Sequence, residues 1–112
     1  MLNLTKKPLI ETVNKDLVLE PENKSLVIDL LTYKNVPTTE EIETKVYALV
    51  EYAKSTNTTA VVIGGENFYI SLLETALLAS SIKPYFEFVD ENGNISLIES
   101  ALVLDGIEEI NT

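Results

Sequence analysis

The hydrophobic and polar positions of the chain change their spacing several times, and these changes outline its elements. Residues 38–55 carry apolar side chains at helical spacing, and a capping box from Thr38 to Glu41 marks the start of that helix. A buried strand is predicted at Ala60–Ile63, where apolar residues run directly into Gly64 and Gly65. A second helix is predicted over Phe68–Ser80, with apolar residues on more than one side.

The amino-terminal part is less regular. Leu2–Thr5 alternates and predicts a short first strand that ends before Pro8. Residues 9–19 are irregular apart from one helical turn. The pattern of Ser25–Tyr33 allows a strand or a helix, and we favour the helix because Pro21 and an acidic residue precede it.

A hairpin is predicted near the carboxyl end. Tyr85–Val89 is rich in strong β-formers, Asn92-Gly93 is a hairpin turn signal, and Ile95–Glu99 is the return strand. Residues 101–104 are a candidate for one more strand. The order of elements predicts a single α/β domain over residues 1–112: a Rossmann-like, mostly parallel sheet flanked by helices, with a C-terminal β-hairpin.

Composition narrows the chemistry. The 112 residues include no cysteine, histidine or arginine. Disulfides, thiolate or imidazole metal sites, cysteine nucleophiles and imidazole acid–base catalysis are therefore excluded. We expect no metal site and no cofactor, and the residues do not decide whether the protein is an enzyme.

The formal net charge of −10 is unevenly spread. Residues 1–34 carry five lysines and five acids, whereas residues 35–112 carry three lysines and thirteen acids. This acidity, with no arginine, argues against sequence-specific DNA binding. No stretch approaches the roughly 20 apolar residues of a membrane span, and no secretory signal is recognisable, so we expect a cytoplasmic protein without a membrane partner.

The candidate ligand site follows from the predicted sheet. Ligands of open parallel sheets bind beyond the carboxyl ends of the strands, where glycines admit a ligand and helix amides favour an anion. The loops at these ends, together with the hydroxyl of Thr39, supply the candidates: Thr5, Lys6, Lys7, Thr39, Gly64, Gly65, Glu66 and Asn67. A third loop, Val89–Glu91, ends the next strand. No catalytic residue is assigned.

Each candidate also has a purely structural interpretation. Glu66 suits the first turn of a helix, the two glycines suit a tight turn, and Lys6-Lys7 could be an ordinary exposed pair. The wide apolar surface of Phe68–Ser80 is typical of a helix with a second contact, so we expect a homodimer through it.

Three motifs carry a resemblance. Leu2-Asn3-Leu4-Thr5, Leu30-Leu31-Thr32-Tyr33 and Ile63-Gly64-Gly65 resemble a family of short bacterial and phage proteins. That family is similar to the CRISPR-associated Rossmann-fold (CARF-like) sensor domains and to stand-alone ring nucleases. The resemblance implies a homodimer that binds a cyclic oligonucleotide second messenger. It also implies that Lys6 or Lys7 stabilises the phosphorane of a metal-independent cleavage.

The chain departs from the family pattern at the implied site. Lys6-Lys7 stands where the family has histidine, Glu66-Asn67 replaces Ala-Pro, and Asp90-Glu91 replaces Arg-Glu. Each change removes positive charge or adds negative charge. Two hypotheses follow. The first is a small nucleotide-binding protein that sequesters or cleaves a cyclic signal in antiviral defence or counter-defence. The alternative is a non-enzymatic acidic interaction protein, such as a phage-encoded inhibitor of a host defence or nucleic-acid enzyme.

Overall fold

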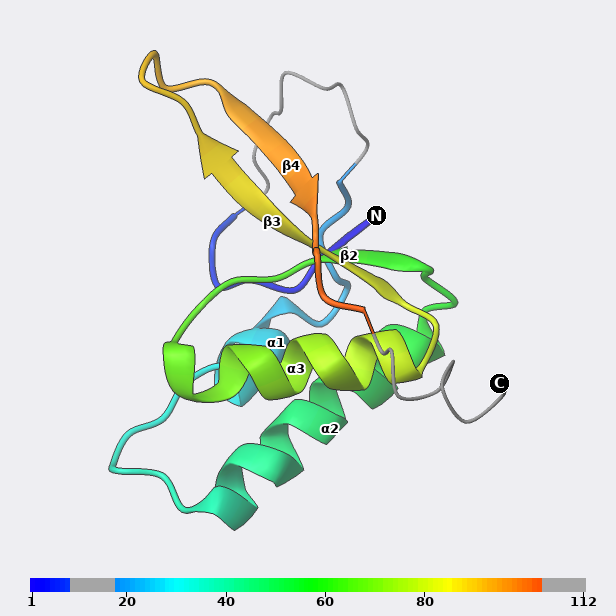
Figure 1. The fold of residues 1–112 in the computed structure, drawn as a ribbon. Helices are drawn as coiled ribbons and strands as arrows, with labels where there is room; N and C mark the ends of the chain where they lie inside the picture. The colour runs from blue at the N-terminus through cyan, green and yellow to red at the C-terminus, as the bar shows by residue number, and fades with distance from the viewer. Residues whose placement is uncertain (9–17, 104–112) are drawn as a thin grey trace.

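The computed structural model describes residues 1–8 and 18–103, which form four strands and three helices (Figure 1). The elements are β1 Leu2–Asn3, α1 Lys24–Leu30, α2 Thr39–Ser55, β2 Ala60–Val62, α3 Asn67–Ala79, β3 Lys83–Val89 and β4 Ile95–Glu99. The α/β class is therefore confirmed.

The sheet order β1-β2-β3-β4 follows the order of the chain. The pairs β1–β2 and β2–β3 are parallel, and β3–β4 is an antiparallel hairpin, so the sheet is mostly parallel as predicted. Because the strand order never reverses, successive right-handed crossovers place their helices on the same face. Figure 1 shows all three helices below the sheet, so the predicted flanking is one-sided.

Local signals account for the first two helices. Asn23 caps α1, with its side chain accepting a hydrogen bond from the Leu26 amide, and the helical interpretation of this segment is confirmed. Thr38 caps α2 by accepting from the Glu41 amide at 3.1 Å. Acids in the first turn and Lys54 in the last complement the dipole of α2.

The core lies between the sheet and the helices. Alternate residues of β1 and β2 and of their extensions (Leu2, Leu4, Val61 and Ile63) face the helices and belong to one buried cluster. The cluster includes residues of all three helices, among them Val27, Leu49 and Leu73. Asn3 and Val62 fall on the opposite face by alternation, and both are also buried.

The wide apolar surface of α3 has an intramolecular explanation. Tyr69, Leu73 and Leu77 are buried, and Ile70 and Leu72 pack against the same core. Since α3 contacts both α2 and β3, its two apolar sides are largely used within one chain. The homodimer through Phe68–Ser80 stays a prediction.

The hairpin extends beyond the rest of the sheet. β3 is seven residues long whereas β2 has three, and Figure 1 shows the β3–β4 turn projecting away from the helices, beyond the rest of the sheet. Gly93 occupies the turn with φ of 84°, a conformation suited to glycine. Residues 101–103 form no strand, so that part of the prediction for 101–104 is wrong. Residue 104 and the predicted helical turn within 9–19 lie outside the described residues.

Within the described residues, no helix is long and apolar enough to cross a membrane.

Candidate ligand-binding crevice

A crevice of about 310 Å³ lies where β1 and β2 end and α3 begins. Its lining comes from every layer of the fold: Thr5, Lys6, Lys7, Leu31, Ile63, Gly64, Gly65, Glu66, Tyr69, Phe86 and Glu87. This is the carboxyl edge of the parallel strands, where open α/β sheets bind their ligands.

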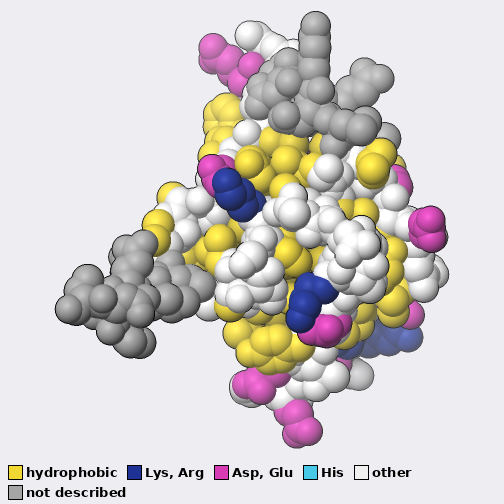
Figure 2. All heavy atoms as spheres, turned by 90° about the vertical axis from the view of Figure 1, so that its right-hand side faces the viewer, with side chains coloured by type: hydrophobic (Ala, Val, Ile, Leu, Met, Phe, Trp, Pro, Cys, Tyr) yellow, Lys and Arg dark blue, Asp and Glu magenta, His cyan; other side chains and the backbone are white. Residues whose placement is uncertain are grey.

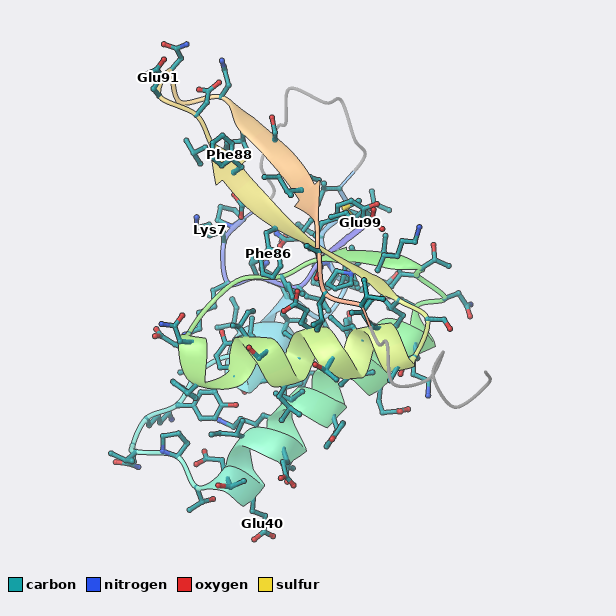
Figure 3. The ribbon with its side chains drawn as sticks, viewed as in Figure 1. Lys7, Glu40, Phe86, Phe88, Glu91 and Glu99 are labelled. Atoms are coloured by element: carbon teal, nitrogen blue, oxygen red, sulfur yellow. The ribbon has the colours of Figure 1, made fainter. Side chains whose placement is uncertain are left out.

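Six of the eight candidate residues from the sequence meet in this crevice: Thr5, Lys6, Lys7, Gly64, Gly65 and Glu66. Asn67, the first residue of α3, follows Glu66 but does not line it. Thr39 begins α2, and Figure 3 shows its neighbour Glu40 at the lower end of the molecule, far from Lys7. The structure therefore does not bring Thr39 to the crevice, because α2 starts far from the sheet.

The lysine loop, Thr5–Lys7, is held by a side chain that the sequence did not reveal. The ammonium group of Lys24 donates hydrogen bonds to the backbone carbonyls of Thr5 and Lys7, each at 2.7 Å. It also forms an ion pair with Glu20 at 2.8 Å. Lys24 thus fixes the loop from α1, and its charge is already used there.

Asn3 supports the same loop from inside the sheet. Its Nδ2 donates to the Lys7 carbonyl at 3.0 Å and to the Glu20 carboxylate at 2.7 Å. Its Oδ1 accepts from the hydroxyl of Thr5 at 2.6 Å and from the Thr5 amide at 3.0 Å. Because Asn3 is buried, these bonds satisfy a polar side chain that would otherwise be costly to bury.

Lys6 and Lys7 differ from most of the described lysines. Lys24, Lys45, Lys54 and Lys83 each pair with a glutamate. Among the described residues, Lys6 and Lys7 form no ion pair, although both are exposed in a strongly acidic chain. The loop therefore places two exposed lysines, without ion pairs among the described residues, in the lining of the crevice.

The two glycines have different roles. Gly65 has φ of 138°, and a Cβ built on it would lie 1.6 Å from the hydroxyl of Tyr69. Tyr69 is only 2% exposed and its hydroxyl donates to the Gly64 carbonyl at 3.3 Å, so it cannot easily move away. At Gly64 the nearest atom to a Cβ is the Thr5 methyl at 3.8 Å, which is an ordinary contact. Gly65 is thus required by the fold, whereas Gly64 leaves the crevice open.

Aromatic rings form the wall behind the crevice. The Tyr69 ring stacks on Tyr33 at 5.8 Å, and Phe68 packs edge-on against both. Burial raises the pKa of Tyr69 above 10.0, opposed by a backbone hydrogen bond from Glu66 and reinforced by the Glu66 carboxylate. Burial likewise raises the pKa of Tyr33. The Lys45 ammonium lies 4.4 Å from the centre of the Tyr33 ring, so this lysine of α2 makes a cation–π contact with the aromatic cluster.

Two carboxylates accompany the lysines. Glu66 precedes α3 and is exposed, and its side chain forms no capping hydrogen bond, so the amides of the first turn remain uncapped by it. Glu87 comes from β3 and is partly exposed, but its Oε2 atom is buried and has no hydrogen-bond partner. The sequence singled out Glu66 but missed Glu87, which reaches the site through β2–β3 pairing.

The third loop does not join the crevice. Figure 3 shows Glu91 at the hairpin tip, well away from Lys7, because β3 continues beyond the end of β2. Asp90 folds the turn back on itself by accepting from the amides of Asn94 and Asn92. The Asn94 amide is the main cause that lowers the pKa of Asp90 below 3.8.

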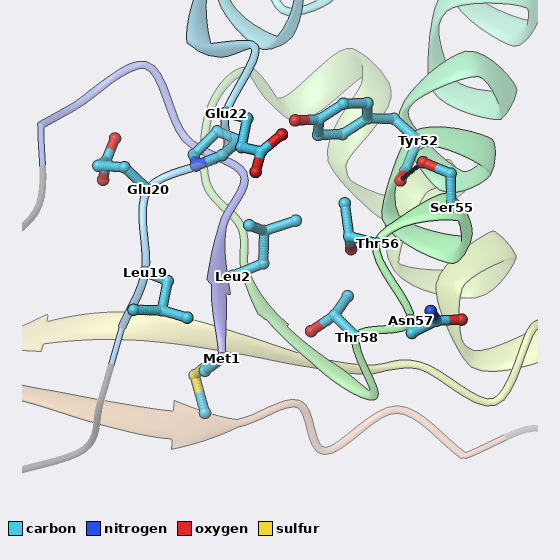
Figure 4. A pocket seen from close by; sticks show the side chains of 11 residues that line it. Met1, Leu2, Leu19, Glu20, Glu22, Tyr52, Ser55, Thr56, Asn57 and Thr58 are labelled. Atoms are coloured by element: carbon cyan, nitrogen blue, oxygen red, sulfur yellow. Dashed lines mark hydrogen bonds between the residues drawn. The ribbon is translucent and has the colours of Figure 1, made fainter.

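A larger groove of about 670 Å³ lies at the amino ends of β1 and β2, beside the end of α2 (Figure 4). Its lining includes Glu20, Glu22, Tyr52, Ser55, Thr56 and Thr58. Several of its hydroxyl groups donate to backbone carbonyls of their own segment, as Ser55 does to Tyr52 at 2.6 Å.

The part of the chain that the structure describes contains no cluster of three or more acidic side chains able to hold a metal ion. No protein family, curated protein or solved structure was found to match the chain.

Proposed function

We propose that this protein binds a small nucleotide in the crevice. The observation that carries the proposal is the pair Lys6 and Lys7, whose ammonium groups lack ion pairs among the described residues and line a cavity at the start of α3. Cationic side chains and the amino end of a helix both favour a phosphate.

The size of the crevice limits what one chain can hold. About 310 Å³ is close to the lower limit of roughly 300 Å³ for small-molecule sites, so we expect one nucleotide unit per crevice. A cyclic oligonucleotide would span the crevices of two protomers. Its binding would therefore require the predicted homodimer through Phe68–Ser80.

Sequestration suits these residues better than cleavage. The chain has no histidine or cysteine to move a proton near neutral pH. Metal-independent cleavage of RNA would then rest on alignment of the 2′-hydroxyl and on lysine charge at the phosphorane. The Tyr69 phenol, with its raised pKa, stays neutral and contributes a hydrogen-bonding group rather than a base.

Calorimetric titration with AMP, GMP, CMP and UMP tests the proposal. We expect at least one to bind with a micromolar dissociation constant, and the K6A/K7A double variant to weaken that binding by about tenfold or more. The matched control is K34A, which removes an exposed lysine outside the crevice and should leave affinity unchanged. Absence of binding by the wild type, or equal losses in both variants, would overturn it.

The alternative, an acidic protein that binds another protein, is favoured by the projecting hairpin. Phe88 is 52% exposed and Ile98 is 50% exposed, and exposed apolar groups of this size are typical of interaction surfaces. On the face shown in Figure 2 the acidic side chains lie scattered, some at the margin and some beside lysines, with apolar side chains between them. This arrangement supports a mixed contact surface better than a charge mimic of nucleic acid.

The two functions can be separated with one variant. F88S/I98S leaves the crevice intact, so it should abolish capture of a protein partner from host lysate while nucleotide binding persists. Retention of the partner by this variant would count against the hairpin as the contact surface.

A further inference from the structure

The buried oxygen of Glu87 is the one polar side-chain atom among the described residues that is buried without a hydrogen-bond partner. Buried polar groups are nearly always paired, because an unpaired acceptor has lost water and gained nothing in return. Glu87 lines the crevice and is only partly buried, so its carboxylate offers a ligand there an acceptor that has no partner among the described residues.

The pairing of the strands explains how Glu87 comes to line the crevice. Asn3 pairs with Val62, and Val62 pairs with Tyr85. Two residues after Asn3, Val62 and Tyr85 in the chain come Thr5, Gly64 and Glu87. Because side chains alternate along a strand, these residues share the face of the sheet opposite the helices. Gly64 has no side chain, so an opening separates Thr5 from Glu87.

The charges of the crevice are balanced, unlike those of the chain. Lys6, Lys7, Glu66 and Glu87 line one cavity, and none of these four side chains forms an ion pair among the described residues. A polyphosphate would meet both carboxylates. A ligand with one anionic group and a separate donor group would match both halves.

We infer that the crevice selects a nucleotide in which a single phosphate lies at Lys6 and Lys7 while an N–H or O–H group donates to the Glu87 carboxylate. This inference rests on the proposed function and deepens it, since it names the feature of the nucleotide that is recognised. The donor is either an amino group of the base or the 2′-hydroxyl of the ribose. A site built around such an acceptor discriminates strongly against analogues that lack the donor.

The test compares AMP with three analogues on the wild-type protein. Purine riboside 5′-monophosphate lacks only the 6-amino group, 2′-deoxy-AMP lacks only the 2′-hydroxyl, and ATP adds two phosphates. We expect one of the first two to bind about tenfold or more weakly than AMP, which identifies the donor, and ATP to bind no more tightly than AMP.

The variant E87Q completes the test. It keeps the shape of the side chain and replaces the charged acceptor, so we expect AMP to bind about tenfold more weakly while the analogue that lacks the donor is unaffected. The matched control is E43Q, which removes an exposed carboxylate outside the crevice and should keep the preference for AMP. Thermal melting establishes that both variants are folded.

The outcomes separate the two proposals. If the wild type binds none of AMP, GMP, CMP and UMP, the proposed function and this inference both fail. If the wild type binds AMP and both analogues equally, or E87Q retains the preference, the proposed function stands and the role of Glu87 is overturned. Tighter binding of ATP than of AMP would overturn the single-phosphate site in the same way.

Discussion

The crevice and the groove lie at opposite ends of the same parallel strands, and the groove has about twice the volume, about 670 Å³ against 310 Å³. In the groove several of the polar groups have partners. The Tyr52 hydroxyl accepts from the Asn23 amide, and Ser55 and Thr56 bond to carbonyls near the end of α2. These bonds close a helix end.

In the crevice several polar groups have no partner among the described residues. Two lysines have no ion pair among the described residues, Glu66 caps no amide with its side chain, and Glu87 Oε2 is buried alone. The contrast teaches that a site is better recognised by unsatisfied chemistry than by volume. Four experiments test the contrast, from the largest expected effect to the smallest.

Gly65→Ala should show how tightly the crevice is built. The new Cβ would combine a positive φ with a clash against the buried Tyr69, so we expect a loss of about 3 kcal/mol or more in unfolding free energy. Gly64→Ala is the control, with room for a Cβ, and should cost less than about 1 kcal/mol. Urea denaturation measures both, and equal losses would contradict the separate roles of the two glycines.

Lys24→Met tests a residue that contacts both regions. Lys24 pairs with Glu20 of the groove and holds the lysine loop of the crevice. Methionine keeps the length of the side chain but cannot donate to the two carbonyls. We expect a loss of about 1–2 kcal/mol in denaturation, together with weaker nucleotide binding in the crevice. Unchanged binding would show that the loop holds its position without Lys24.

Tyr69→Phe tests the wall of the crevice through pH. The pKa of Tyr69 is raised above 10.0 in the folded state. The contribution of Tyr69 to the free energy of unfolding is therefore complete below pH 10 and is lost as the pH rises through the folded-state pKa. We expect the variant to lose about 0.5–1 kcal/mol at neutral pH with its hydrogen bond to Gly64. The gap between wild type and variant should shrink above pH 10; a constant gap would contradict the assignment.

Ser55→Ala probes the groove and should have the smallest effect. Its hydroxyl is exposed and bonds only within its own turn, so we expect a change within about 0.5 kcal/mol. Nucleotide affinity should be unchanged in calorimetry. A drop in affinity would move the ligand from the crevice to the groove and break the comparison.

The sequence predicted most of what depends on neighbouring residues. The Thr38 cap and the apolar spacing after it predict α2, and the turn at Gly64 and Gly65 predicts the position of the crevice. Loop residues after predicted strands could be grouped because parallel strands end at one edge.

What the sequence did not predict depends on contacts between distant residues. Nothing near Thr5 indicates that Lys24 would bind its carbonyl, and nothing near Gly65 indicates that Tyr69 would lie against it. Strand length is also set by pairing, so the overhang of β3 and the position of Glu87 became visible only with β2 and β4 in place.

The short first strand has a consequence for the order in which the site is assembled. β3 and β4 meet across a tight turn, whereas Leu2 meets Val61 only after about half of the chain has closed into a long loop, which costs more chain entropy. We therefore expect the lysine loop to dock on the sheet late in folding and to be among the first segments to unfold locally. A nucleotide bound to Lys6 and Lys7 would hold the amino terminus on the sheet, and slower hydrogen exchange at the Leu4 amide, which donates to Val62, would record it.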